Sequence, residues 1–389
     1  MYGKIILYCH VGVVQRMCDL IRIEEQEKEI LFKLAWIFKD SLNDFSTSVD
    51  RSLRYLDKIV LPIIMASKED KSYNPFSEII EKYVIHILIR KFERDGYSLL
   101  PLGYSSDLTL ENEKYILNID IKTANIENLS DFKNTINVGI NQMTHVAQLK
   151  LNNKFLPPPY FVYPTIPPFY EINDGSKKLV LTYGLMFIYP SYRDLVDSIR
   201  EDYDKLFKLF RQKLKEVLIQ IIQKDFGISE EEAKRIIESR PNKSRHSKDE
   251  LITESLIRGI FLHNQEKEKI LESLQISANE LDIIKSFSDQ LGEFVKQLQD
   301  KDIKPIAIIS ISLPNGLLKE KYLDRFVSGK DYAKSARYHY GNGIFELIKE
   351  RTGKEFPRVI FIDVNKDYLD FLKKYFNKII MLDYQLNVL

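Results

Sequence analysis

The feature that most constrains the fold is a run of alternating side chains at residues 115–124, with the sequence Tyr-Ile-Leu-Asn-Ile-Asp-Ile-Lys-Thr-Ala. Successive side chains of a β-strand point to opposite faces, so Ile119 and Ile121 share one face and can pack on a core. The opposite face carries polar groups, from Asn118, Asp120 and Lys122. The run therefore predicts a strand on which a carboxylate stands beside an ammonium group.

A hairpin is expected to bring a second carboxylate to this strand. Residues 99–110 have the pattern of extended chain, and the polar segment 111–114 is typical of a turn. Folding about this turn places Asp107 opposite Asn118 and diagonal to Asp120, about 7–8 Å away at Cα. A slip of one residue would turn Asp107 to the other face.

Two such carboxylates and a lysine suit the hydrolysis of a phosphodiester. Two neighbouring carboxylates can share one Mg²⁺ ion, with magnesium–oxygen distances of about 2.0–2.1 Å. A bound metal polarises the phosphate and lowers the pKa of a bound water. The ammonium of Lys122 can orient or deprotonate that water, or stabilise the negative charge of the transition state.

The elements around the hairpin also follow from the sequence. Residues 76–94 contain neither glycine nor proline, and Asp95-Gly96 follows them, which predicts a helix and its end. A second helix is expected over residues 137–150 and a strand over 178–190. Short β-branched runs at 305–314 and 358–364 predict two more strands.

Asp107, followed by Asp120-Ile121-Lys122 in a strand after a polar turn, resembles the PD-(D/E)XK nuclease superfamily, in particular the type II restriction endonucleases. The resemblance implies an α/β (α+β) fold whose core is a mixed sheet flanked by helices, with additional helical and α/β regions. In this family the first acidic residue often follows a proline, whereas here it follows Ser106. The resemblance also suggests Glu81 as a further catalytic carboxylate, with Glu78 as the alternative, and Gln142 as a polar counterpart.

The acid-x-lysine spacing alone is unspecific, because it recurs at Asp302-Ile303-Lys304 and Glu232-Ala233-Lys234. Residues 232–234 lie in a helical pattern, which does not place the acid and the lysine on one face. No acidic hairpin partner precedes Asp302. Only residues 107–122 combine hairpin, alternation and an earlier acid. The alternative for them is an ordinary amphipathic hairpin with a surface ion pair.

Four regions are expected along the 389 residues. They are an N-terminal helical region (1–70), the nuclease core (71–190), a helical region for DNA contact or dimerisation (191–300), and a C-terminal α/β region for DNA recognition (301–389). The apolar segment at 5–14 is too short to span a bilayer, which takes about 20 residues. We expect it to be a buried strand or the start of a helix rather than a signal peptide.

Cysteine content and missing motifs exclude several classes of protein, whereas the net charge does not. The formal net charge is +1, which neither supports nor excludes nucleic acid. Two cysteines, Cys9 and Cys18, make neither a disulfide framework nor a zinc site, and favour a cytoplasmic location. The sequence has no GxxxxGK loop and no short histidine pair. We therefore expect no nucleotide cofactor, no zinc and no membrane partner.

Two basic segments are candidates for contact with DNA. The segment 335–343 interleaves Arg337, His339 and Asn342 with tyrosines, and the segment 234–248 includes Lys243 and Arg245. Arginine, lysine, asparagine and glutamine make most contacts to phosphates and base edges, and Gln142 is added on that ground. For each segment a solvated surface or a packed loop is an equally open explanation.

The sequence thus predicts a magnesium-dependent type II restriction enzyme of a restriction–modification system. In that family the cut leaves 5′-phosphates. Such an enzyme would act on double-stranded DNA as a homodimer, because symmetric sites are read by symmetric proteins. Two alternatives remain open: a repair or recombination nuclease of the same fold that recognises DNA structure, and a DNA-binding protein without catalysis.

Overall fold

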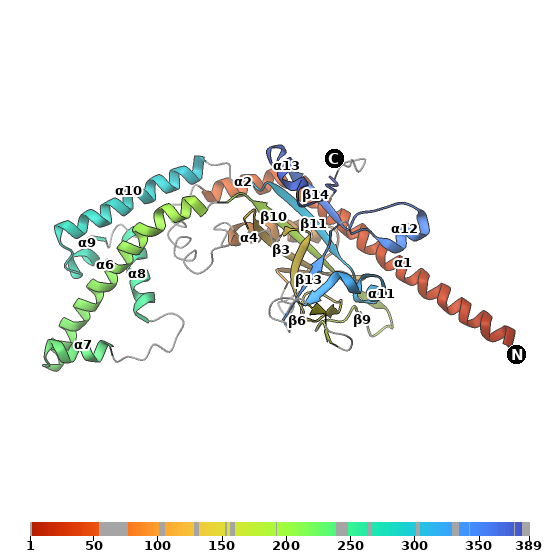
Figure 1. The fold of residues 1–389 in the computed structure, drawn as a ribbon, viewed down its shortest axis with the longest axis horizontal. Coiled ribbons are helices and arrows are strands. Elements are labelled where there is room, and N and C mark those ends of the chain that lie inside the picture. The colour runs from red at the N-terminus through yellow and green to blue at the C-terminus, as the bar shows by residue number, and fades with distance from the viewer. Residues whose placement is uncertain are drawn as a thin grey trace. The chain divides into compact units, whose positions relative to one another are not determined.

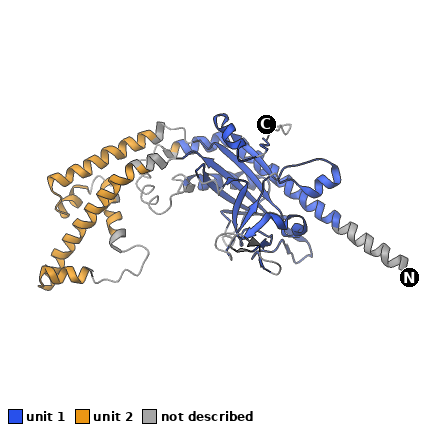
Figure 2. Ribbon diagram, in the orientation of Figure 1, with its two compact units in different colours: residues 1–50, 76–191, 304–389 blue, residues 51–75, 192–303 orange. Residues whose placement is uncertain are grey.

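The computed structural model describes residues 2–53, 77–100, 106–127, 132–151, 154–155, 160–191, 193–238, 248–262, 267–300, 304–328, 334–341, 343–376 and 378–382. The chain divides into two compact units, coloured blue and orange in Figure 2. Unit 1 comprises residues 1–50, 76–191 and 304–389, and unit 2 comprises residues 51–75 and 192–303. This grouping differs from the four expected regions, because residues 304–389 share a unit with the expected nuclease core.

The larger sheet of unit 1 has seven strands within the described residues. Its order is β1 (Ser98–Leu99), β2 (Leu108–Glu111), β3 (Tyr115–Asn125), β10 (Lys177–Tyr189), β11 (Ala307–Leu313) and β14 (Val359–Val364), with β9 (Phe169–Glu171) also paired to β10 (Figure 1). Strand β3 runs parallel to β10, and the other neighbours are antiparallel. The predicted fold class, a mixed sheet flanked by helices, is confirmed.

Strand β10 lies at the centre of this sheet because apolar residues occupy both of its faces. From Leu179 to Tyr189 every residue is buried, as expected for a strand covered on two sides. The expected strands at 115–124, 178–190, 305–314 and 358–364 correspond to β3, β10, β11 and β14 and are confirmed.

A second sheet in unit 1 contains five strands in the described part of the chain. They are β4 (Thr135–Gly139), β13 (Ser335–His339), β12 (Phe326–Ser328), β5 (Ala147–Gln148) and β8 (Phe161–Val162), while β6 (Lys150–Leu151) and β7 (Lys154–Phe155) form a separate pair. The expected helix over 137–150 is therefore wrong. Residues 135–139 instead pair with β13, about 200 residues later in the sequence. Such tertiary pairing overrides local helix propensity.

Helices cover one face of the larger sheet. They are α1 (Tyr2–Asp40), α2 (Leu42–Leu53) and α4 (Ser77–Arg94). Phe38 of α1 and Phe45 of α2 each place their rings 5.4 Å from the ring of Phe187 in β10. The predicted helix over 76–94 is confirmed as α4, and Gly96 follows it with φ +79°, a conformation that glycine adopts without strain. No described helix is both long enough and apolar enough to cross a membrane.

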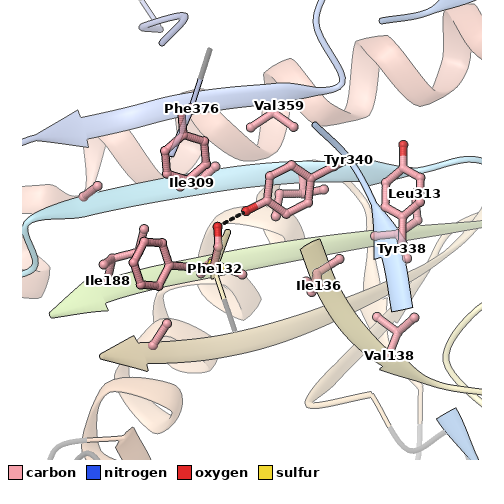
Figure 3. Packing of buried hydrophobic residues seen from close by; sticks show 14 of the residues in the cluster. Phe132, Ile136, Val138, Ile188, Ile309, Leu313, Tyr338, Tyr340, Val359 and Phe376 are labelled. Atoms are coloured by element: carbon pink, nitrogen blue, oxygen red, sulfur yellow. Dashed lines mark hydrogen bonds between the residues drawn. The ribbon is translucent and has the colours of Figure 1, made fainter. Parts of the chain in front are cut away.

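The second sheet packs against the other face of the larger sheet. Figure 3 shows Ile136 and Val138 of β4 beside Tyr338 of β13, with Ile188, Ile309 and Leu313 of the larger sheet in the same core. Gly184 of β10 permits the close approach, because a Cβ atom there would lie 2.3 Å from Cδ1 of Ile136. Tyr340 donates its buried hydroxyl to the carbonyl of Phe132 at 2.8 Å, which satisfies the one polar group of that ring in the core.

Short elements connect the last strands of unit 1. They are η1 (Gly316–Leu318), α11 (Lys319–Tyr322), η2 (Leu323–Arg325), α12 (Glu346–Thr352), η3 (Lys366–Tyr368) and α13 (Leu369–Lys373). Gly316 lies against the segment after β4, since a Cβ atom at this position would stand 2.2 Å from the carbonyl oxygen of Thr144. The Gly316 N–H also donates to the Thr144 hydroxyl at 2.9 Å.

Unit 2 is helical throughout its described residues. Its helices are α6 (Arg193–Phe226), α7 (Glu230–Glu238), α8 (Lys248–Leu262), α9 (Lys267–Ser273) and α10 (Ala278–Asp300). Tyr203 of α6, Phe261 of α8 and Phe287 of α10 bring their rings together in its core. Ser229 and Glu232 form a capping box at the start of α7, which accounts for one of the unspecific acid-x-lysine triplets.

A buried arginine joins α1 to the C-terminal half of unit 1. Arg358, which precedes β14, is fully buried and lies 3.3 Å from Glu24 and 2.8 Å from Glu27, both on α1. Its guanidinium is sandwiched by the rings of Tyr322 and Phe345, whose centroids lie 4.4 and 4.2 Å away. The two glutamates are bound further, because Ile348 donates its N–H to Glu24 and Asn315 donates its N–H to Glu27.

Burial raises the pKa of Glu27 to about 7, against the opposing effect of Arg358, while the neighbouring Glu24 adds to the rise. The cluster therefore depends on the arginine to offset the burial of the Glu27 carboxylate in an apolar surrounding.

We expect Arg358→Met to destabilise the protein strongly, because it leaves Glu24 and Glu27 buried without a cation. The expected loss is about 3–5 kcal/mol in the free energy of unfolding, measured by chemical denaturation. Arg351→Met is the matched control, since Arg351 pairs with Glu25 at the surface and such pairs contribute about 0–1 kcal/mol. Equal losses for the two variants would contradict the structural role of the buried cluster.

Candidate active site

The hairpin of β2 and β3 carries the predicted acidic pair, in a register different from the expected one. Leu108 faces Ile119 and Thr109 faces Asn118, so the expected pairing of Asp107 with Asn118 is wrong by two residues. A shift of two keeps every side chain on its face because the side-chain period of a strand is two. Asp107, just before β2, remains on the side of the hairpin that carries Asp120.

Asp120 lies in the middle of β3 and is completely buried. Its Oδ1 atom accepts hydrogen bonds from Lys122 Nζ at 2.9 Å and from Gln142 Nε2 at 3.2 Å. Its Oδ2 atom is buried and has no hydrogen-bond partner among the described residues. One carboxylate oxygen is thus held by Lys122 and Gln142, and the other accepts no hydrogen bond from the part of the chain that the structure describes.

Asp107 is fixed by the backbone of the same strand. The N–H of Ile121 donates to its Oδ2 atom at 2.6 Å. Burial raises the pKa of Asp120 to about 7; the ammonium of Lys122 lowers it, and the nearby carboxylate of Asp107 raises it further. Two carboxylates in so close a space are unfavourable without a cation.

Lys122 stands among the acidic groups at the edge of the site. Burial acts to lower its pKa, but the carboxylates of Asp120, Asp107 and Glu81 outweigh this effect, so the pKa is raised. Glu81, on α4, is therefore close enough to act on the same ammonium. The structure brings together Asp107, Asp120 and Lys122, from the segment before β2 and from β3, while Glu81 on α4 contributes the smallest of these effects on the pKa of Lys122.

The residues present fit a divalent cation. Carboxylate oxygens are the ligands that Mg²⁺ prefers, and the unsatisfied Oδ2 of Asp120 lies beside the carboxylate of Asp107. Among the described side chains no group of three or more His, Cys, Asp or Glu residues is arranged to hold a metal. The protein ligands would come from this pair of aspartates, whose carboxylates lie close together.

Comparison with known families decides the class of the protein. Residues 19–194 match the family model described as type II restriction enzyme MwoI, N-terminal domain. This segment, just under half of the chain, is similar to that restriction-enzyme domain. The match includes Glu81, Asp107, Asp120 and Lys122. The predicted resemblance to type II restriction endonucleases is confirmed, and with it the enzyme class, a site-specific deoxyribonuclease that binds DNA.

Two solved structures share low similarity with this chain. The restriction endonuclease BglI bound to its DNA recognition sequence matches over 90% of this chain and 99% of that chain, with 13% identity and a TM-score of 0.37. The tetrameric restriction endonuclease SfiI bound to cognate DNA matches over 90% and 93%, with 10% identity and a TM-score of 0.35. No curated protein sequence matches the chain.

The residues predicted to contact DNA lie in different environments in the structure. Arg337 and His339 lie on the more exposed face of β13, and Arg337 Nε donates to Asn137 Oδ1 of β4 at 3.2 Å. Gln142 is buried, and its amide is bound within the protein. Lys243, Arg245 and Asn342 lie outside the described residues.

Sequence reasoning missed a chain of buried polar side chains beside Asp120. Ser106 and Thr109 share a hydrogen bond of 2.6 Å, and Thr109 donates to Asn118 at 3.2 Å. Asn118 and Thr182 of β10 both donate to the carbonyl of Gln142, at 3.3 and 2.9 Å. The sequence offered one sign of this chain: Thr182 places a hydroxyl group within the mainly apolar run of β10.

We expect Asp120→Asn to stabilise the metal-free protein at high pH. The folded state favours the protonated form of Asp120, so its contribution to stability is present below the ordinary pKa near 4 and is lost as the pH rises through about 7. Asparagine stays neutral throughout. In EDTA the variant should have the higher Tm at pH 8, by about 2–4 °C for each kcal/mol relieved, and the gain should vanish toward pH 4.

Asp40→Asn is the control for this measurement. Asp40 is exposed, and its hydrogen bond with Lys91 lowers the pKa of its carboxyl, so the substitution should bring no gain in Tm at pH 8. A gain for Asp120→Asn that does not change with pH would show that the buried carboxyl is not the group being relieved.

Proposed function

We propose that the chain is a magnesium-dependent, sequence-specific endonuclease that hydrolyses phosphodiester bonds of double-stranded DNA and leaves 5′-phosphates. The observation that carries the proposal is the buried Asp120, whose free Oδ2 lies beside Asp107 while Lys122 holds Oδ1. The match of residues 19–194 to a restriction-enzyme domain supports the same reaction.

Asp107 and Asp120 would hold the ion, and Glu81 would add negative charge at the edge of the site. When bound, Mg²⁺ neutralises the scissile phosphate and activates a water molecule. Lys122 carries a positive charge, supported by its raised pKa. This favours its role as a donor that orients the attacking water and stabilises the charge that develops on the phosphate.

The exposed face of β13 is the proposed DNA-contacting surface of unit 1, through Arg337 and His339. Lys243, Arg245 and Asn342 are proposed to add phosphate or base contacts. Gln142 no longer belongs to this set, because both ends of its amide are bound within the protein. We further propose a homodimer that reads a symmetric site, with the helical region 191–300 serving DNA contact or dimerisation.

Cleavage of unmethylated phage DNA tests the proposal directly. We expect discrete fragments with Mg²⁺ and none in EDTA, and loss of cutting in Asp120→Ala. Lys122→Ala should slow cutting by about 10²–10⁴-fold. Lys178→Ala is the matched control, because Lys178 of β10 also pairs with a carboxylate of the same sheet, that of Glu111 in β2 at 2.8 Å, yet has no place in the site.

The pattern of products separates the candidate functions. A smear, or cutting only at branched DNA, would favour a repair nuclease of the same fold. Intact DNA with both Mg²⁺ and Mn²⁺ would contradict the proposal, and cutting that survives Asp120→Ala would place the active site elsewhere.

Binding to an uncut segment of phage DNA that contains a cleavage site tests the surface on β13. In Asp120→Ala protein, which should bind without cutting, we expect Arg337→Ala to weaken binding by about 1–3 kcal/mol, or 5- to 150-fold in Kd. Arg351→Ala, at a surface ion pair on α12, should leave Kd unchanged. Equal Kd values for the two arginine variants would remove β13 from the proposed interface.

A further inference from the structure

Gln142 connects the second sheet to the catalytic aspartate. It lies in the turn after β4 and is only 8% exposed. Its Oε1 atom accepts the N–H of Gly139 at 2.6 Å, and its Nε2 atom donates to Asp120 Oδ1 at 3.2 Å. A backbone N–H can only donate, so the oxygen of the amide must face Gly139 and the NH₂ group must face Asp120.

The backbone of Gln142 is held as firmly as its side chain. Its N–H donates to the carbonyl of Gly139 at 3.0 Å, and its carbonyl accepts from Asn118 and Thr182. Asn118 and Thr182 face each other across β3 and β10, two residues before Asp120 and Gly184. The amide is thus fixed from both sheets, and side chains held in this way can set the geometry of a site.

These bonds determine which oxygen of Asp120 is free. Oδ1 receives both Lys122 and Gln142, so rotation of the carboxylate would break two hydrogen bonds to a buried group. We propose that Gln142 is a positioning residue that keeps Oδ2 of Asp120 available to the divalent cation. The identity of that cation site rests on the proposed function.

The same contact links Asp120 to the proposed DNA-contacting strand. Gly139 of β4 pairs with Ser335 of β13, and Asn137 pairs with Arg337. On the buried side of β4, Ile136 and Val138 pack beside Tyr338, as Figure 3 shows. Loss of the contact between Gln142 and Asp120 should impair cation binding and cleavage and leave DNA affinity intact.

Gln142→Met tests the inference, because methionine has a similar length and neither donates nor accepts an amide hydrogen bond. Gln148→Met in β5 is the matched control, with no hydrogen bond to Asp120. We would titrate the DNA-free proteins with Mn²⁺ alone, followed by electron paramagnetic resonance. We would also measure kcat, KM and the Mg²⁺ midpoint on phage DNA. Gln142→Met should bind Mn²⁺ about 10–100-fold more weakly and lower kcat with KM unchanged, whereas Gln148→Met should match wild type.

Wild-type Mn²⁺ binding and kcat in folded Gln142→Met would overturn the inference, as would a rise in KM alone. If that variant does not fold, Gln142→Asn takes its place, since it keeps an amide that is too short to reach both Gly139 and Asp120. Wild-type Mn²⁺ binding by Gln142→Asn would equally overturn it. If the wild-type protein cuts no DNA, the proposed function fails, while the comparison of Mn²⁺ binding still decides the role of Gln142.

Discussion

The parallel pairing of β3 with β10 is the constraint from which the arrangement of unit 1 follows. Parallel neighbours cannot be joined by a tight turn, so the chain must leave the larger sheet after Asn125 and re-enter it at β9, which leads into β10. The residues between supply β4, β5 and β8 to the second sheet. That sheet packs where Gly184 leaves room for Ile136, and the turn after β4 therefore meets Asp120.

Unit 1 buries charge in two places and balances it differently in each. Around Arg358 the balance is internal, because one guanidinium serves two glutamates and two aromatic rings cover its faces. Around Asp120 the balance is incomplete: Lys122 and Gln142 satisfy one oxygen and leave the other buried without a partner. The first cluster contributes to the stability of the fold, and the second retains an unfavourable carboxylate that a cation can relieve.

The two sheets of unit 1 carry different parts of the proposed site. The larger sheet carries the carboxylates and the lysine on β3, where pairing with β2 and β10 fixes the backbone. The second sheet presents polar side chains from β4 and β13 on one face and packs apolar ones on the other. The side-chain amide of Gln142 connects the two sheets, because it accepts a hydrogen bond from Gly139 of β4 and donates one to Asp120 of β3.

Local sequence determined the elements of the site, and tertiary contacts decided how they meet. The alternation at 115–124 was sufficient to predict β3 and the shared face of Asp120 and Lys122, because the side-chain period of a strand is a local property. The hairpin register was misjudged by two residues, since several registers satisfy the same alternation, but the face of Asp107 was unaffected. The helix expected over 137–150 was wrong because β4 pairs with a strand from the far end of the chain. The contact of Gln142 with Asp120 could not be predicted for the same reason. It forms only when the crossover places the second sheet against β3, and the separation of the two residues in the sequence does not indicate that they are close in space.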